Sequence, residues 1–133
     1  DADYEIAKEA YLEYFRKMHQ LFPKCKKMVM AVRNQIASSH HTLSGLLYDA
    51  VEDQLYTTRI YDIEPIVDPM GVGDAFIAAY IHAHQKWGDK NQYCLDFSLS
   101  ASAIKNTVPG DQNLVTEEEI INNMTSSGGR IQR

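Results

Sequence analysis

The chain has 133 residues, 44% of them hydrophobic, and a formal net charge of −5 at pH 7. Its length suits a single domain, and its acidic balance argues against a nucleic-acid surface, which needs clustered basic side chains. No apolar run is long enough to cross a bilayer, and the sequence shows no signal-peptide pattern. Cys25 and Cys94 are far apart in the sequence, and we expect two reduced thiols in a cytoplasmic protein.

The first half of the chain predicts one helix followed by three strands. Apolar residues repeat at helical spacing between Asp3, the expected N-cap, and Pro23, the expected stop. A continuous apolar run then favours a strand buried on both faces, and two later segments favour strands joined by an acidic turn. The expected segments are a helix at 4–22, a strand at 28–32, a polar stretch at 34–42, and strands at 44–48 and 55–61.

The second half predicts three helices after a glycine turn. Gly88 is the expected end of the first helix, and Thr116 with Glu119 forms a capping box for the last. A helix, a buried strand, a hairpin and then helices indicate an α/β layered domain over residues 1–125. The expected segments are helices at 73–87, 92–105 and 116–124, followed by a flexible tail at 126–133.

The stretch from Val67 to Phe76 carries the most informative chemistry. Its pattern indicates a short extended segment, a glycine turn and an acidic residue that opens a helix. Gly71 and Gly73 allow backbone N–H groups to converge on an anion, and the helix N-terminus adds a partial positive charge. Asp74 would repel a phosphate that is merely held, but phosphate transfer needs a group that orients the incoming hydroxyl and takes its proton. The turn therefore indicates phosphoryl transfer.

This stretch resembles the C-terminal signature of the PfkB, or ribokinase-like, sugar kinases, which runs Asp-Thr-x-Gly-Ala-Gly-Asp-x-Phe. Pro69 stands where threonine is common in that family, and Val72 stands where alanine or glycine is usual. The resemblance implies the C-terminal part of a ribokinase-like layered α/β/α fold. The matching positions are Asp68, Gly71, Gly73, Asp74 and Phe76.

A second motif is similar to the 2-keto-3-deoxygluconate kinase branch of the same family. The run from Ala103 to Asp111 resembles that branch's Ala-Leu-Lys-x-Thr-x-Pro-Gly-Asp, with Ile104 in place of leucine. Kinases of this family are much longer than this chain, so the resemblance implies a C-terminal fragment that is inactive alone. We therefore expect exposed apolar surface and association of the fragment, and a full-length protein compatible with a homo-oligomer.

The resemblance assigns roles to the residues of the glycine turn. Asp74 is the expected catalytic base, and the backbone N–H groups of Gly71, Val72 and Gly73 are the expected anion hole. Asp68 is expected to help hold a monovalent cation or, through water, Mg²⁺. The alternatives are a plain helix cap for Asp74 and an ordinary structural turn for the other residues.

Four further residues are candidates for binding ATP. By the resemblance, Ala103, Asn106 and Pro109 line the adenine and ribose pocket, with a plain helix end as the alternative. Arg33 follows the predicted buried strand and could reach a nucleotide phosphate, because α/β folds place ligands beyond the carboxyl ends of strands. An ion pair with a surface carboxylate is the alternative for Arg33.

Together these features predict ATP-dependent phosphorylation of a small sugar or sugar acid, with 2-keto-3-deoxygluconate as the first candidate and ATP and Mg²⁺ as cofactors. Another PfkB kinase of fructokinase or ribokinase type and a nucleotide-binding module without catalysis are the alternatives. No nucleic-acid or membrane partner is expected. No histidine metal site is expected, because His82 and His84 diverge on a helix and the pair His40–His41 lacks partners at ligand spacing.

Overall fold

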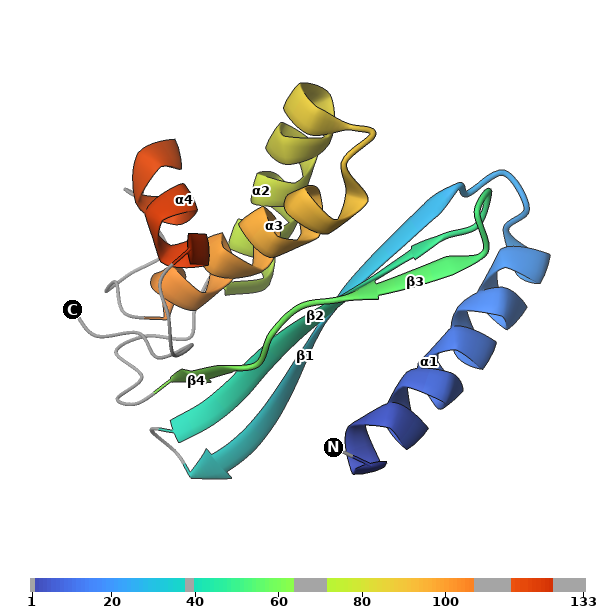
Figure 1. The fold of residues 1–133 in the computed structure, drawn as a ribbon, viewed down its shortest axis with the longest axis horizontal. Helices are drawn as coiled ribbons and strands as arrows, with labels where there is room; N and C mark the ends of the chain where they lie inside the picture. Colours follow the sequence, from blue (N-terminus) through green and yellow to red (C-terminus); the bar gives the residue numbers. More distant parts are fainter. Residues whose placement is uncertain (1, 38–39, 64–71, 107–115, 126–133) are drawn as a thin grey trace.

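The computed structural model describes residues 2–37, 40–63, 72–106 and 116–125, which form a sheet with helices on both faces (Figure 1). The order of elements is one helix, four strands and three helices. In chain order they are α1 (Ala2–Leu21), β1 (Lys27–Ala37), β2 (His40–Asp49), β3 (Gln54–Thr57), β4 (Tyr61–Ile63), α2 (Val72–Trp87), α3 (Asn91–Lys105) and α4 (Glu117–Thr125).

The sheet is antiparallel, and β2 is its central strand. β1 pairs along the whole of β2, with a register shift between Gln35 and Ala37. β3 pairs with the second half of β2, and β4 pairs with its first part, where Ile63 lies opposite His41. Among the described residues, the outer edge of β1 has no strand partner. The start of β2 and the end of β4 therefore lie side by side.

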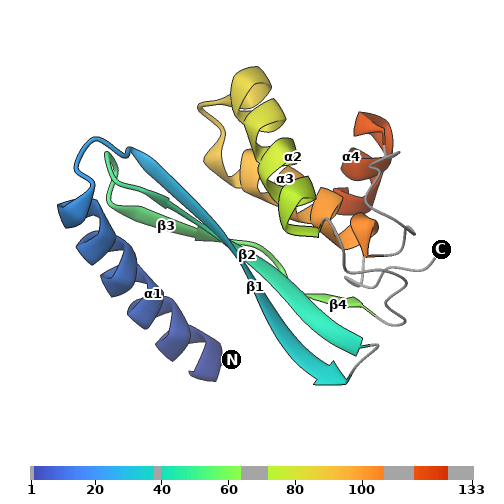
Figure 2. The same cartoon turned by 180° about the vertical axis from the view of Figure 1, so that it is seen from behind.

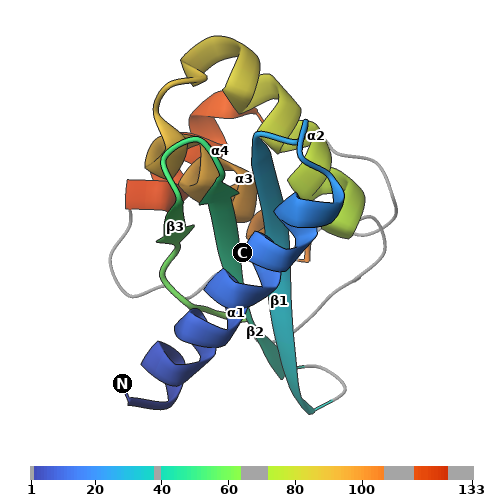
Figure 3. The same cartoon turned by 90° about the vertical axis from the view of Figure 1, so that its right-hand side faces the viewer.

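Helices cover the two faces of the sheet because successive strand residues point to opposite sides. Views from three directions show α1 on one side of the sheet and α2 with α3 on the other (Figures 1, 2 and 3). α4 packs on α3 through Ile120 rather than on the sheet. This arrangement confirms the predicted layered α/β fold. One core layer contains Phe15, Leu46, Tyr48 and Leu55, and the other contains Leu43, Leu47, Ile63, Phe76, Leu95, Leu99 and Ala103.

Two glycines set the positions of α2 and α3. A Cβ atom on Gly88, between the two helices, would lie 2.7 Å from the carbonyl oxygen of His84, so the turn needs glycine. A Cβ atom on Gly45 would lie 3.3 Å from side-chain atoms of both Leu95 and Thr58, so α3 lies close against β2. The short turn makes α2 and α3 an antiparallel pair, which brings the start of α2 and the end of α3 to the same end (Figure 1).

Several predicted boundaries are wrong. α1 begins at Ala2, so Asp3 lies inside the helix rather than capping it. Within the predicted polar stretch at 34–42, residues 34–37 continue β1 and residues 40–42 open β2, because antiparallel pairing satisfies the backbone groups of both strands there. β1 is not buried on both faces, since it is an edge strand and Ala31 is exposed. The strand expected at 55–61 is divided between β3 and β4.

Other local expectations are confirmed. α1 ends two residues before Pro23, and α2 begins at Val72, one residue ahead of the predicted start. Thr116 Oγ1 accepts a hydrogen bond of 3.1 Å from the Glu119 N–H, which is half of the predicted capping box. Both cysteines are free.

Several large apolar side chains are exposed on the described part of the molecule. Ile77 and Ile81, one turn apart on α2, are 48% and 54% exposed. No helix within the described residues has the length and apolar character needed to cross a membrane. The exposed large apolar residues are Tyr14, Leu21, Phe22, Val51, Ile60, Ile77 and Ile81.

Candidate active site

The first turn of α2 contains Val72, Gly73 and Asp74. The first N–H groups of a helix have no carbonyl partner within the helix, so those of Val72 and Gly73 are the donors that an anion at this helix start would meet. Asp74 is exposed beside them. A carboxylate next to unpaired N–H donors is the arrangement that the predicted base and anion hole require.

Gly73 has no structural need to be glycine within the described chain. Its φ angle is not in the left-handed region, and a Cβ atom placed on it would meet no described atom within 4 Å. Glycine costs stability in a helix because it loses more backbone freedom than other residues on folding. Close approach of a ligand to the backbone is another physical reason for a glycine, and it is compatible with the open space at this position.

The last turn of α3 holds Ala103, and the residue that follows the helix is Asn106. Ala103 packs in the core with Leu43 and Ile63. Asn106 Nδ2 donates a hydrogen bond of 3.0 Å to the carbonyl oxygen of Ser102. Neither Ala103 nor Asn106 has exposed surface. Their side chains can therefore shape a nucleotide pocket only by fixing the end of α3.

Arg33 and His41 lie on the face of the sheet that α3 covers. Arg33 pairs with Leu43, a residue of that core layer, and His41 is two residues earlier on the same strand. Arg33 lies within β1 rather than at its end, as the sequence suggested, because the strand continues to Ala37. Its side chain is exposed and makes no ion pair with any described residue. The predicted alternative of a surface ion pair finds no partner in this part of the chain.

His41 is buried, with 2% of its surface exposed. Burial lowers the pKa of His41, the positive charges of Arg33 and His40 lower it further, and the side chain of Asn106 opposes the shift. Because its ordinary pKa is already below 7, the imidazole is neutral at pH 7. A neutral imidazole offers one N–H donor and one nitrogen acceptor.

The start of α2 and the end of α3, which carry most of the described candidate residues, lie at the same end of the antiparallel helix pair. Phe76 from the start of α2, Ala103 from the end of α3 and Ile63 from the end of β4 share one core cluster. Figure 1 shows the start of α2 near the end of α3, and the end of β4 beside the start of β2. Asp68, Gly71 and Pro109, which were also predicted as site residues, lie outside the described residues.

Two charged or titratable residues near this end were not predicted to belong to a site. His41 was considered only as part of a metal cluster, although the alternation of His41, Leu43 and Gly45 with more polar neighbours indicates a strand that buries every second residue. Lys105, in the last turn of α3, is 1% exposed. A cation at a helix C-terminus complements the negative end of the helix dipole, which is a signal that the sequence did contain.

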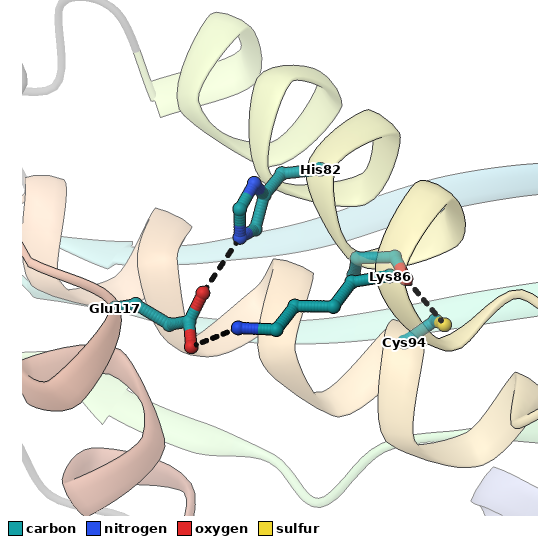
Figure 4. Close-up of polar contacts among 5 residues, drawn as sticks. His82, Lys86, Cys94 and Glu117 are labelled. Atoms are coloured by element: carbon teal, nitrogen blue, oxygen red, sulfur yellow. Dashed lines mark hydrogen bonds and ion pairs between the residues drawn. The ribbon is translucent and has the colours of Figure 1, made fainter.

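Polar contacts fasten α2 to its neighbours along the helix (Figure 4). His82 Nε2 lies 2.8 Å from Glu117 Oε2, and Lys86 Nζ donates to Glu117 Oε1 over 2.8 Å. The hydrogen bond from Lys86, and then that from His82, lower the pKa of Glu117. Cys94 donates to the carbonyl oxygen of Trp87 at 3.2 Å, and burial raises the pKa of this thiol. These contacts join α2 to α4 and α3.

The residues that the structure describes contain no group of three or more His, Cys, Asp or Glu side chains able to hold a metal ion. His82 is instead engaged with Glu117, and His84 stacks on Tyr80 with ring centroids 5.8 Å apart. A hydrogen bond joins His40 to Asp62. These three histidines therefore contact other side chains of the described chain.

No protein-family model and no curated protein sequence matches this chain. Solved structures do match. A 2-dehydro-3-deoxygluconokinase from Thermotoga maritima superposes with a TM-score of 0.82 at 27% identity, over 89% of this chain and 34% of that kinase. A PfkB family carbohydrate kinase from Listeria grayi superposes with a TM-score of 0.79 at 30% identity, over 85% of this chain and 34% of that one. A third structure, from Enterococcus faecalis, is 17% identical with a TM-score of 0.71 and bears on the fold alone.

The fold is therefore that of carbohydrate kinases, and the predicted resemblance to the PfkB family is confirmed. The chain spans about a third of the length of the kinases that it matches, a share consistent with a C-terminal portion. Among these structures, the similarity includes the 2-dehydro-3-deoxygluconokinase that the second sequence motif indicated.

Proposed function

We propose that this chain is the C-terminal, nucleotide-binding portion of an ATP-dependent sugar-acid kinase whose substrate is 2-keto-3-deoxygluconate. The observation that supports the proposal is that the α2 start, where Asp74 is exposed in the first turn, and the α3 end lie at the same end of the antiparallel helix pair. The similarity to a 2-dehydro-3-deoxygluconokinase supports the choice of substrate.

In the proposed reaction, Asp74 orients a primary hydroxyl of the sugar acid and accepts its proton. The hydroxyl oxygen forms a bond to the γ-phosphorus as the bond from that phosphorus to the β–γ bridging oxygen breaks, and ADP leaves with the bond's electron pair. The N–H groups of Gly71, Val72 and Gly73 stabilise the charge on the transferred group. In such a loose transition state, positioning and charge stabilisation supply most of the acceleration.

Mg²⁺ fits this scheme because it is usually held by one or two carboxylates together with substrate phosphates, rather than by a cluster of protein ligands. Asp68 is the residue that we propose to face the cation, directly or through water. The ion would neutralise negative charge on the phosphates. The chain itself would supply backbone N–H groups at the start of α2 as hydrogen-bond donors to the transferred phosphate.

The test is ATP-dependent phosphorylation by the full-length polypeptide that carries this chain, measured over a panel of sugars and sugar acids. Asp74→Asn should lower kcat by at least about a hundredfold, because general base catalysis contributes about 10²–10⁴-fold. Asp89→Asn is the matched control, since Asp89 is exposed at the opposite end of the α2–α3 pair. It should leave the rate unchanged.

Each other outcome has a defined meaning. Turnover of a different sugar that still depends on Asp74 would support Asp74 as the base and show that the proposed substrate is wrong. ATP binding without turnover of any sugar would favour the second candidate function, a non-catalytic nucleotide-binding module. The same α2 start with its unpaired N–H groups supports that alternative, because phosphate binding needs them whether or not transfer follows.

A further inference from the structure

Two polar atoms near the proposed site are buried without a hydrogen-bond partner among the described residues. They are Nε2 of His41 and Oδ1 of Asn106. His41 is 2% exposed and Asn106 has no exposed surface. Buried polar groups are almost always paired, because an unpaired group loses its hydrogen bonds to water without replacement. Two such unpaired polar atoms near the same site therefore need an explanation.

The two residues lie on elements that pack together. His41 is opposite Ile63 in the sheet, and Ile63 shares a core cluster with Ala103 in the last turn of α3. Asn106 follows that turn directly. The side chain of Asn106 is also close enough to raise the pKa of His41 against the lowering effect of burial. The imidazole and the amide are therefore neighbours, and neither His41 Nε2 nor Asn106 Oδ1 has a hydrogen-bond partner in the described part of the chain.

The chemistry of the two groups is complementary. A neutral imidazole with its proton on Nε2 is a donor there, and an amide oxygen is an acceptor. The amide nitrogen of Asn106 already donates to the carbonyl oxygen of Ser102, which leaves Oδ1 turned to receive a donor. A hydrogen bond from Nε2–H of His41 to Oδ1 of Asn106 would satisfy both atoms.

We infer that His41 is a positioning residue of the nucleotide site, whose Nε2–H holds the Asn106 amide oxygen and so fixes the end of α3 for the nucleotide. This inference rests on the proposed function for its ligand. It does not make His41 a catalytic residue, because the imidazole acts through Asn106 and not on the reacting atoms. Its expected effect is on nucleotide affinity rather than on the chemical step.

The test measures MgATP affinity by calorimetry, together with kcat and the KM values for ATP and sugar, in the full-length polypeptide. His41→Phe removes the donor and should raise the Kd and KM for ATP about tenfold, in line with the loss of one buried hydrogen bond. It should change kcat at saturating ATP by no more than about twofold. His41→Gln places an amide N–H near the position of Nε2 and should restore affinity to within about threefold.

Asn91→Ala is the matched control. Asn91 is also a buried asparagine with an unpartnered Oδ1, but it lies at the opposite end of α3, where its Nδ2 donates to Asp49 and Glu52. Its removal should lower stability without changing the KM for ATP. If the His41→Phe protein does not fold, the comparison of His41→Gln with Asn106→Ala provides the same test, because only the second removes the acceptor.

The outcomes separate this inference from the proposed function. Unchanged ATP affinity in His41→Phe would overturn the inference, as would an equal loss in Asn91→Ala or a failure of glutamine to rescue. The absence of any nucleotide binding by the unmodified protein would overturn it as well. ATP binding that depends on His41, in a protein that phosphorylates no sugar, would support the inference while the kinase proposal fails.

Discussion

Gly73→Ala distinguishes a glycine needed by a ligand from a glycine needed by the fold. A Cβ atom at this position would meet no described atom within 4 Å, and the backbone is not in the left-handed region. Alanine is favoured over glycine by about 1 kcal/mol inside a helix, and by less in the first turn. We therefore expect the free energy of unfolding to rise by about 0.5 kcal/mol, which corresponds to about 2 °C in melting temperature.

The same substitution should impair phosphoryl transfer. The added methyl group would stand where the transferred phosphate is proposed to approach the start of α2. Loss of one donor in an anion hole costs about 10²–10³ in kcat, and a displaced phosphate would weaken more than one donor. We expect kcat to fall by at least about tenfold in the full-length polypeptide, with the KM for the sugar little changed. ADP release and urea unfolding followed by circular dichroism would measure the two effects.

Gly88→Ala is the control, because its Cβ atom would lie 2.7 Å from the His84 carbonyl oxygen at the far end of the helix pair. That variant should lose stability but keep the activity of its folded fraction. The reasoning is refuted if Gly73→Ala unfolds more easily than the unmodified chain, which would make the glycine structural. Full activity in Gly73→Ala would refute the proposed close approach of phosphate.

Two pH-dependent effects are also expected. The hydrogen bonds from Arg16 and then Tyr48 lower the pKa of Asp53 from 3.8 to about 2, so this carboxylate stabilises the fold above pH 4 and the contribution disappears as the pH falls towards 2. The urea midpoint should fall less on acidification in the Asp53→Asn variant than in the unmodified chain. Asparagine, like aspartate, tolerates the φ of 53° at this position. Burial raises the pKa of Tyr80 from 10.0 to about 12, so ionisation of the unfolded chain should lower stability between those pH values. The Tyr80→Phe variant should not lose stability in this pH range. An equal loss of stability in this variant would show that Tyr80 is not its cause.

The sequence predicted the helices well because their signals are local. Helical spacing, Pro23, Gly88 and the Thr116 capping box act within a few residues, and each corresponds to an observed helix boundary or cap. The glycine turn was informative for a similar reason, since its residue types and their spacing are both specified within ten positions.

The strand pairing and His41 could not be predicted in the same way. The sequence showed only a polar stretch at 34–42, but residues 34–37 and 40–42 lie in two strands whose pairing satisfies their backbone groups. The burial of His41 depends on α3, which is more than fifty residues away in the sequence. Likewise, the predicted pocket role of Ala103 and Asn106 did not reveal that both side chains are fully buried, because burial is decided by the packing of β2, β4 and α3 together.

Arg33 offers a separate test of the site's electrostatics. It is exposed on the face of the sheet that carries His41, and its positive charge helps to lower the pKa of that histidine. Arg33→Met should therefore raise the pKa of His41 towards its ordinary value of 6.5, because a neighbouring cation disfavours the imidazolium. If Arg33 also contacts a nucleotide phosphate, the same variant should raise the KM for ATP about tenfold.

An NMR titration of the histidine resonances and ATP kinetics on the same variants would examine both effects. Arg33→Lys keeps the charge, so the pKa of His41 should stay low in that variant, while the KM for ATP should rise only in part because lysine cannot form a bidentate contact. A raised pKa of His41 with an unchanged KM would show that Arg33 lies beside the histidine but does not reach the nucleotide. If Arg33→Met moves neither quantity, the placement of Arg33 beside His41 is wrong, and the proposed phosphate contact is wrong as well.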